Sequence, residues 1–155
     1  MFPQLMIITF IMTSRLEEKL LLNRAKEFSN NINGIDFFSI SLLNEDDFFW
    51  HREELKRAHA INDEVERIYF EQPVKERYLV ETIADLLHIT NGFTCYFFYE
   101  GIVSVCVSGN DFYSFLVSMF KLNDTYDLSL MFKCPDRVFI IDDDEYSLGI
   151  FHKMK

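Results

Sequence analysis

The chain has 155 residues, of which 49% are hydrophobic and 16% aromatic, with only five glycines and three prolines. This length and composition predict one domain spanning residues 1–155 and exclude a disordered or low-complexity chain. The formal net charge is −10, because 25 acidic residues stand against 15 basic ones. Phosphates repel such a chain and no local basic patch is evident, so we expect no direct binding of nucleic acid.

The first twelve residues, MFPQLMIITFIM, are apolar. They are fewer than the roughly 20 that a membrane helix needs, and no basic residue precedes Arg15 as in a secretory signal. We expect them to form a first strand or an apolar tail docked on the core. In a second interpretation, translation begins at Met6 or Met12. Either way the sequence predicts a cytoplasmic protein that does not bind a membrane.

A helix followed by a strand is predicted next. Thr13 and Ser14, followed by Glu17, have the spacing of a capping box, in which hydroxyl and carboxylate satisfy free backbone N–H groups. The predicted helix runs from about residue 14 to residue 30. Residues 35–43 are rich in Ile, Phe and Ser with partial alternation, which is typical of a strand.

Two more helices are expected before the middle of the chain. Residues 44–47, Asn-Glu-Asp-Asp, provide an N-cap and negative charge where a helix begins. Apolar residues then recur at threes and fours as far as about Tyr69. Pro73 suits the first turn of a further helix, which Asn91 and Gly92 end.

After Gly92 the sequence changes from charged helices to aromatic strands. Residues 94–107, TCYFFYEGIVSVCV, predict a hairpin. With Glu100-Gly101 as a two-residue turn, Phe98 would face Val103. Both faces of this hairpin are largely apolar, so we expect it to be covered by other elements.

The last third of the chain predicts a helix and three strands. Asn110 and Asp111 would cap an amphipathic helix. Its apolar residues are Phe112, Phe115, Leu116, Met119 and Phe120. Residues 127–133, 138–141 and 146–151 alternate as strands. The full order is α-β-α-α-β-β-α-β-β-β, which favours an α+β domain with an antiparallel sheet in the C-terminal half, covered on one side by helices.

The three cysteines lack the spacing of a zinc site. In the predicted hairpin Cys95 lies directly across from Cys106, a separation that geometry allows for a disulfide. A cytoplasmic location argues against that bond. We expect Cys95 and Cys106 to be small core residues with reduced thiols.

We find no motif for catalysis or for binding a cofactor or metal. The sequence has no nucleophile elbow and no glycine-rich phosphate loop. The histidines are scattered, and although His51 and Glu54 lie three residues apart, nothing nearby completes a ligand set. An enzyme whose site combines dispersed residues such as His51, Glu54 and Asp142 is kept as an alternative.

One acidic segment deserves comparison with ion-binding loops. Asp142, Asp143, Asp144 and Glu145 are adjacent and lack the glycine of an EF-hand, so we predict no metal there. Acids in a turn keep a sheet edge soluble. They also concentrate negative potential, which accelerates encounter with a basic protein. Both interpretations are open.

A second acidic segment begins the helix expected after residue 44. Glu45, Asp46 and Asp47 precede Phe48-Phe49-Trp50. Charge beside aromatic residues is typical of a binding interface in which Trp50 would be the anchor. The alternative is an ordinary helix start with its aromatic residues buried in the core.

The closing segment, VFIIDDDEYSLGIF, resembles the sheet hairpins of bacterial immunity proteins that neutralise contact-dependent or polymorphic toxins. The resemblance implies a stoichiometric inhibitor of a cognate toxin, often a basic nuclease. A secretion chaperone is the main rival, since such proteins are also small, acidic and α+β, but they usually act as dimers. We expect a monomer that binds a basic protein partner.

Overall fold

The computed structural model describes residues 2–59 and 67–155, and side chains from Arg15 onward. The elements are α1 (Phe2–Asn30), β1 (Phe37–Leu42), α2 (Phe49–His59), β2 (Ile68–Glu71), α3 (Glu76–Leu87), β3 (Phe93–Tyr99), β4 (Val103–Gly109), α4 (Phe112–Asn123), β5 (Leu128–Phe132), β6 (Arg137–Asp143) and β7 (Ser147–Met154). The α+β class and the predicted order are confirmed, with β2 as one further strand.

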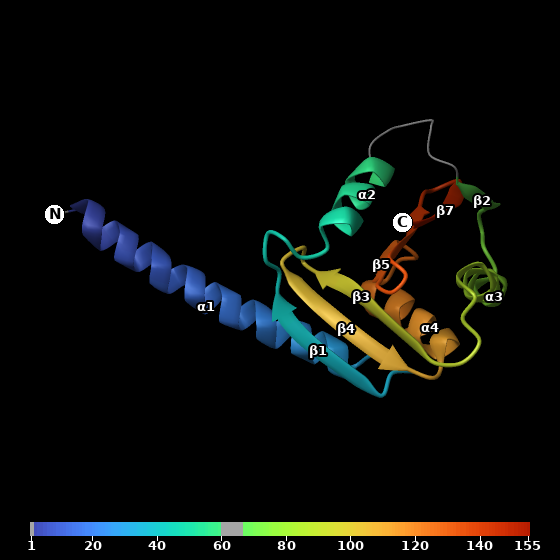
Figure 1. The fold of residues 1–155 in the computed structure, drawn as a ribbon, viewed down its shortest axis with the longest axis horizontal. Helices are drawn as coiled ribbons and strands as arrows, with labels where there is room; N and C mark the ends of the chain where they lie inside the picture. The colour runs from blue at the N-terminus through green and yellow to red at the C-terminus, as the bar shows by residue number, and fades with distance from the viewer. Residues whose placement is uncertain (1, 60–66) are drawn as a thin grey trace.

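The strands form a seven-stranded antiparallel sheet in the order β1-β4-β3-β5-β6-β7-β2 (Figure 1). Its five inner strands come from the C-terminal half of the chain, as expected. The two edge strands, β1 and β2, come from the N-terminal half. The sheet therefore joins both halves of the described chain in one hydrogen-bonded unit.

Helices cover both faces of the sheet, not one. On the first face α1, α3 and α4 pack over the main core, in which Phe115, Leu79 and Ile83 are fully buried. On the second face α2 packs over a smaller cluster that includes Met131 and Ile140. Alternate residues of β5 and β6 enter the two clusters, which follows from the two-residue period of a strand.

The N-terminal segment is helical, so the strand predicted for the first twelve residues is wrong. Helix α1 begins at Phe2 and continues through Thr13 and Ser14, which therefore cannot cap a helix start. In Figure 1 its N-terminal end points away from the sheet, and its C-terminal end lies against β1 and β4. Among the described residues, no helix combines the length and hydropathy needed to span a membrane.

The helix predicted from residue 44 is shorter than expected. It begins at Phe49 and ends at His59, and residues 68–71 form strand β2, which pairs with β7. The prediction for residues 60–66 lies outside the described residues. Within β2, Phe70 packs on the main core while Ile68 and Tyr69 are exposed, so pairing with β7 and not a buried helical face determines the structure here.

The β3–β4 hairpin has a three-residue loop, residues 100–102, instead of the predicted two-residue turn. Tyr99 pairs with Val103, and Glu100 and Gly101 both have positive φ. Gly101 accommodates this conformation without steric cost, whereas Glu100 does so with some strain. The extra loop residue shifts the register by one position.

That shift changes the prediction for the cysteines. Cys95 pairs with Val107, and Cys106 pairs with Tyr96, so the two thiols lie on opposite faces of the sheet. Both are free, and burial raises the pKa of the Cys95 thiol. A disulfide between Cys95 and Cys106 is incompatible with this register.

Candidate functional site

The centre of the sheet contains a gap between β3 and β5. In the described chain these strands pair at one position only, Tyr96 with Met131, whereas β3 pairs with β4 at seven positions. Continuing the antiparallel register beyond that pair places Tyr99 opposite Leu128, but no pairing joins them. In a strand paired on one side only, alternate residues direct their N–H and C=O groups to the open side. Both walls of the gap are therefore open strand edges.

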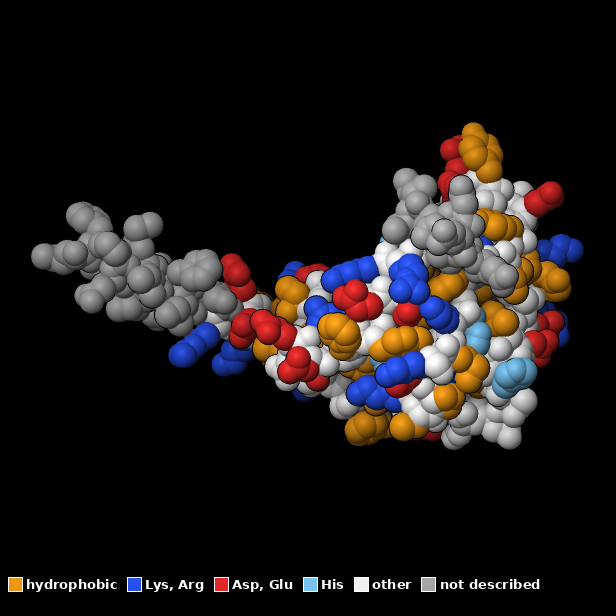
Figure 2. Space-filling model, turned by 45° about the horizontal axis from the view of Figure 1, so that its top comes forward, with side chains coloured by type: hydrophobic (Ala, Val, Ile, Leu, Met, Phe, Trp, Pro, Cys, Tyr) orange, Lys and Arg blue, Asp and Glu red, His pale blue; other side chains and the backbone are white. Residues whose placement is uncertain are grey.

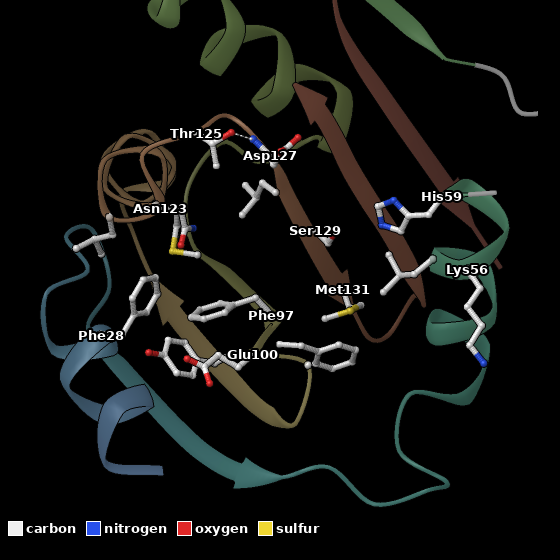
Figure 3. A pocket seen from close by; sticks show the side chains of 17 residues that line it. Phe28, Lys56, His59, Phe97, Glu100, Asn123, Thr125, Asp127, Ser129 and Met131 are labelled. Atoms are coloured by element: carbon white, nitrogen blue, oxygen red, sulfur yellow. Dashed lines mark hydrogen bonds between the residues drawn. The ribbon is translucent and has the colours of Figure 1, made fainter. Parts of the chain in front are cut away.

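A groove of about 1070 Å³ occupies this gap (Figure 3). Its lining is mainly apolar and comes from both faces of the sheet. From the first face α1 and α4 contribute Phe28 and Met119, and from the second face α2 contributes Leu55. Phe28, Phe97 and Met131 point into the space in Figure 3. The volume lies just above the usual range for ligand sites in proteins, about 300–1000 Å³.

Two carboxylates lie at the mouth of the groove. Glu100 follows β3 and Asp127 precedes β5, and both line the groove. Figure 3 shows them on opposite sides of the space. The Glu100 carboxylate is 3.3 Å from Arg24, but both side chains are about half exposed, so this pair contributes little.

The same end of the sheet carries a larger set of acids, which we call the acidic end. It is built from the ends of β2, α3, α4, β5 and β6. Its carboxylates are Glu71, Glu76, Asp124, Asp127, Asp142, Asp143, Asp144 and Glu145, and its basic residues are His59, Arg67, Lys75 and Lys121. Burial first, and then the carboxylates of Glu76 and Asp143, raise the pKa of Tyr126 at this end.

Asp142 and Asp143 belong to β6 and hold the acidic end together. The Asp142 carboxylate pairs with Arg67, which also donates to the carbonyl of Ala58. Asp143 accepts hydrogen bonds from the Gln72 amide at 2.7 Å, from the Thr125 hydroxyl at 3.3 Å and from a third donor, described below. These two carboxylates are half-buried, so the prediction that all four acids occupy an exposed turn does not fit them.

The third donor is the backbone N–H of Tyr126, at 3.2 Å. In return, the backbone N–H of Asp143 donates to the Asp127 carboxylate at 2.6 Å. Carboxylates from β5 and β6 are thus fixed side by side by backbone donors. Only Asp144 and Glu145 project fully into solvent, beside Tyr146, which is 79% exposed.

The segment around Glu45 is arranged differently from its prediction. Glu45 and Asp46 are exposed, and Asp47 accepts a hydrogen bond from the N–H of Asn44. Trp50 is partly buried against the second-face cluster, whereas Phe49 is 68% exposed. Phe49 is therefore more accessible to a partner than Trp50.

The two predicted acidic segments do not meet. Residues 45–47 precede the first turn of α2, and Asp142 lies near His59 at its last turn, with 3.8 Å between Oδ1 and the His59 Nδ1. A helix of 11 residues is about 16 Å long. The two segments therefore lie about one helix length apart.

The residues of the enzyme alternative are also separated. The ring of His51 is buried, with Nε2 2.7 Å from the carbonyl of Phe132, and Glu54 is buried and pairs with Lys153 at 3.1 Å. Asp142 lies four residues along β6 from the position that pairs with Lys153, about 14 Å away. The described residues contain no group of three His, Cys, Asp or Glu placed to hold a metal ion.

The second face is more mixed in charge than the acidic end. On α2, Arg52, Lys56 and Arg57 lie among Glu53 and Glu54. Figure 2, turned so that the upper side of Figure 1 comes forward, shows basic side chains interspersed with acidic and apolar ones. The net negative charge is therefore unevenly distributed over the described surface.

Several residues of the site were missed from the sequence. Glu76, Asp124 and Asp127 are separated in the chain by long segments and reach the acidic end through the packing of α3, α4 and β5. No local motif signals this, because each acid alone is typical of a helix end or a loop. Tyr146 could have been noted as an aromatic residue in an acidic turn.

Comparison of the chain with protein-family models, with curated proteins and with solved structures found no match.

Proposed function

We propose that the chain is a protein-binding inhibitor of the immunity type, which neutralises a basic toxin by covering it in a stoichiometric complex. The observation that carries the proposal is the acidic end, where carboxylates from β2, α3, α4, β5 and β6 outnumber cations at one end of the sheet. Such a surface attracts a basic partner and orients it before contact.

The hydrogen bonds at this end support the same conclusion. Asp143 and Asp127 are held by backbone N–H donors, so their charges are fixed before a partner arrives. Fixed charges avoid part of the side-chain ordering that binding otherwise costs. The exposed Tyr146 adds an aromatic surface, and aromatic residues are enriched among binding hot spots.

The test is the association rate with a basic toxin domain, taken first from the product of the adjacent gene. Replacing Asp144 and Glu145 with Lys reverses charge without removing the bonds of Asp143. We expect association to slow by about tenfold or more at low salt and to depend less on ionic strength.

The matched control is Glu81→Lys combined with Asp85→Lys, because these two exposed acids lie on α3 and their reversal changes the net charge by the same amount. Its association rate should stay close to that of the unchanged chain. Equal association rates for the charge-reversed and the unchanged chain would show that the acidic end is not part of the interface. Co-expression adds a functional readout, since the chain should rescue growth in the presence of the toxin.

A further inference from the structure

We propose that the groove between β3 and β5 binds an extended apolar segment of the partner, which adds a strand to the sheet and places a Lys or Arg between Glu100 and Asp127. The inference deepens the proposed function and rests on it in taking the partner to be a protein. It names the part of the partner that enters the chain and the chemistry that selects it.

The open edges of β3 and β5 are the first observation that supports the binding of an extended segment. Beyond the pair of Tyr96 with Met131, β3 and β5 separate, and the groove lies between residues 97–99 and residues 127–129. A third strand in this space would find hydrogen-bonding groups on both walls, as in strand addition to a sheet edge. A compact small molecule would satisfy few of these groups.

The lining specifies the side chains of the segment. A strand directs alternate residues to opposite faces. On the first face these residues would meet Phe28 and Met119, and on the second face they would meet Leu55 and Phe98. Both sets of residues would therefore be buried against apolar walls. The segment should be a continuous apolar run, as in strands covered on both faces, and not an alternating one.

The charges at the mouth of the groove indicate which residue type should lie at the end of the bound segment. Glu100 and Asp127 both line the groove and lie on opposite sides of it in Figure 3. A cation that enters the groove between these two carboxylates would be attracted by both of them. Arg24 lies 3.3 Å from Glu100, and Lys56, which lines the groove, lies 3.5 Å from Glu53. Both pairs are exposed and contribute little, so a Lys or Arg of the partner can replace them at the mouth.

In the experiment, a display library of random seven-residue peptides is selected for binding to the full chain. Peptides that also bind the Ser129→Trp variant, in which the Trp side chain fills the groove, are removed. Enriched peptides should contain an apolar run next to Lys or Arg. As synthetic peptides they should slow hydrogen exchange of backbone amides in residues 97–99 and 128–130. Binding should fall by about tenfold for Ser129→Trp and about fivefold for Glu100→Lys.

Two matched controls separate the groove from general effects. Ser41→Trp places the same bulk on exposed β1, and Glu81→Lys makes the same charge change at another Arg-paired carboxylate. Both should bind the peptides like the unchanged chain. Because Glu100→Lys alters only an exposed side chain, it remains informative if Ser129→Trp does not fold.

Three results would overturn the inference: no peptide that survives counter-selection, protection that lies outside the groove, or equal binding by Glu100→Lys. Self-association of the chain that Ser129→Trp abolishes would assign the groove to a second copy instead. The selection uses isolated peptides, so its failure leaves the acidic end unaffected. Conversely, unchanged toxin association after charge reversal at Asp144 and Glu145 leaves peptide binding in the groove unaffected.

Discussion

Replacing Asp143 with Ala should destabilise the fold far more than the same change at Asp144 or Glu145, the two fully exposed acids of this segment. The carboxylate accepts hydrogen bonds from Gln72, Thr125 and the backbone of Tyr126. A hydrogen bond to a charged group contributes about 1.5–3 kcal/mol, less where water has access. Relief of repulsion from neighbouring acids offsets part of the loss. We expect the free energy of unfolding to fall by about 2–3 kcal/mol.

Urea unfolding at pH 7 measures this change as a lower midpoint with an unchanged slope. Glu145→Ala is the control, because Glu145 is exposed two residues further along the same turn. Its unfolding free energy should stay within about 0.5 kcal/mol of the original. If Asp143→Ala and Glu145→Ala unfold at the same urea concentration, the three hydrogen bonds do not stabilise the acidic end.

Three further predictions concern local structure. Asp111→Ala should cost about 1 kcal/mol, because the carboxylate caps α4 through Ser114. Hydrogen bonds from the backbone N–H of Ser114, and then from its hydroxyl, lower the pKa of Asp111 in the folded chain. The contribution of Asp111 to stability is therefore complete above the pKa of the unfolded chain and is lost as the pH falls through the pKa of the folded chain. Unfolding measured over a series of acidic pH values would show this loss. Cys134 should react with a thiol reagent in the folded chain, and Cys95 only after unfolding. A time course that follows the modification of each cysteine separately would check this. Gly34→Ala should lower the thermal midpoint, since the new Cβ would lie 2.3 Å from a backbone oxygen and φ is +82°.

Helix α4 shows why some elements were predictable from sequence. Asp111 caps the helix, and the five apolar residues identified by their spacing are all buried. Cap and stripe lie within a few turns of each other, so the information is local. The same holds for the strands of the C-terminal half, whose alternation directs residues to the two faces of the sheet.

The hairpin register and β2 show where local information ends. The sequence around Glu100 is compatible with a two-residue or a three-residue loop. The difference of one loop residue shifts the register, and this moves every side chain of β4 to the other face relative to β3. In β2, the sequence Ile-Tyr-Phe-Glu is compatible with the end of an apolar helix. Pairing with β7, about 80 residues later, decides in favour of a strand.

The candidate site depends wholly on such distant pairings. The groove exists because β3 and β5 meet at one pair and then separate, and no residue of either strand has an unusual sequence. Phe97 and Leu128 look like ordinary core residues, and both are buried. The acids Glu100 and Asp127 look like ordinary loop residues. Only their arrangement distinguishes them, because it sets apolar residues along two open strand edges and carboxylates at the mouth. A composition can predict that an acidic chain favours basic partners, but the place where a partner could enter the sheet follows from topology.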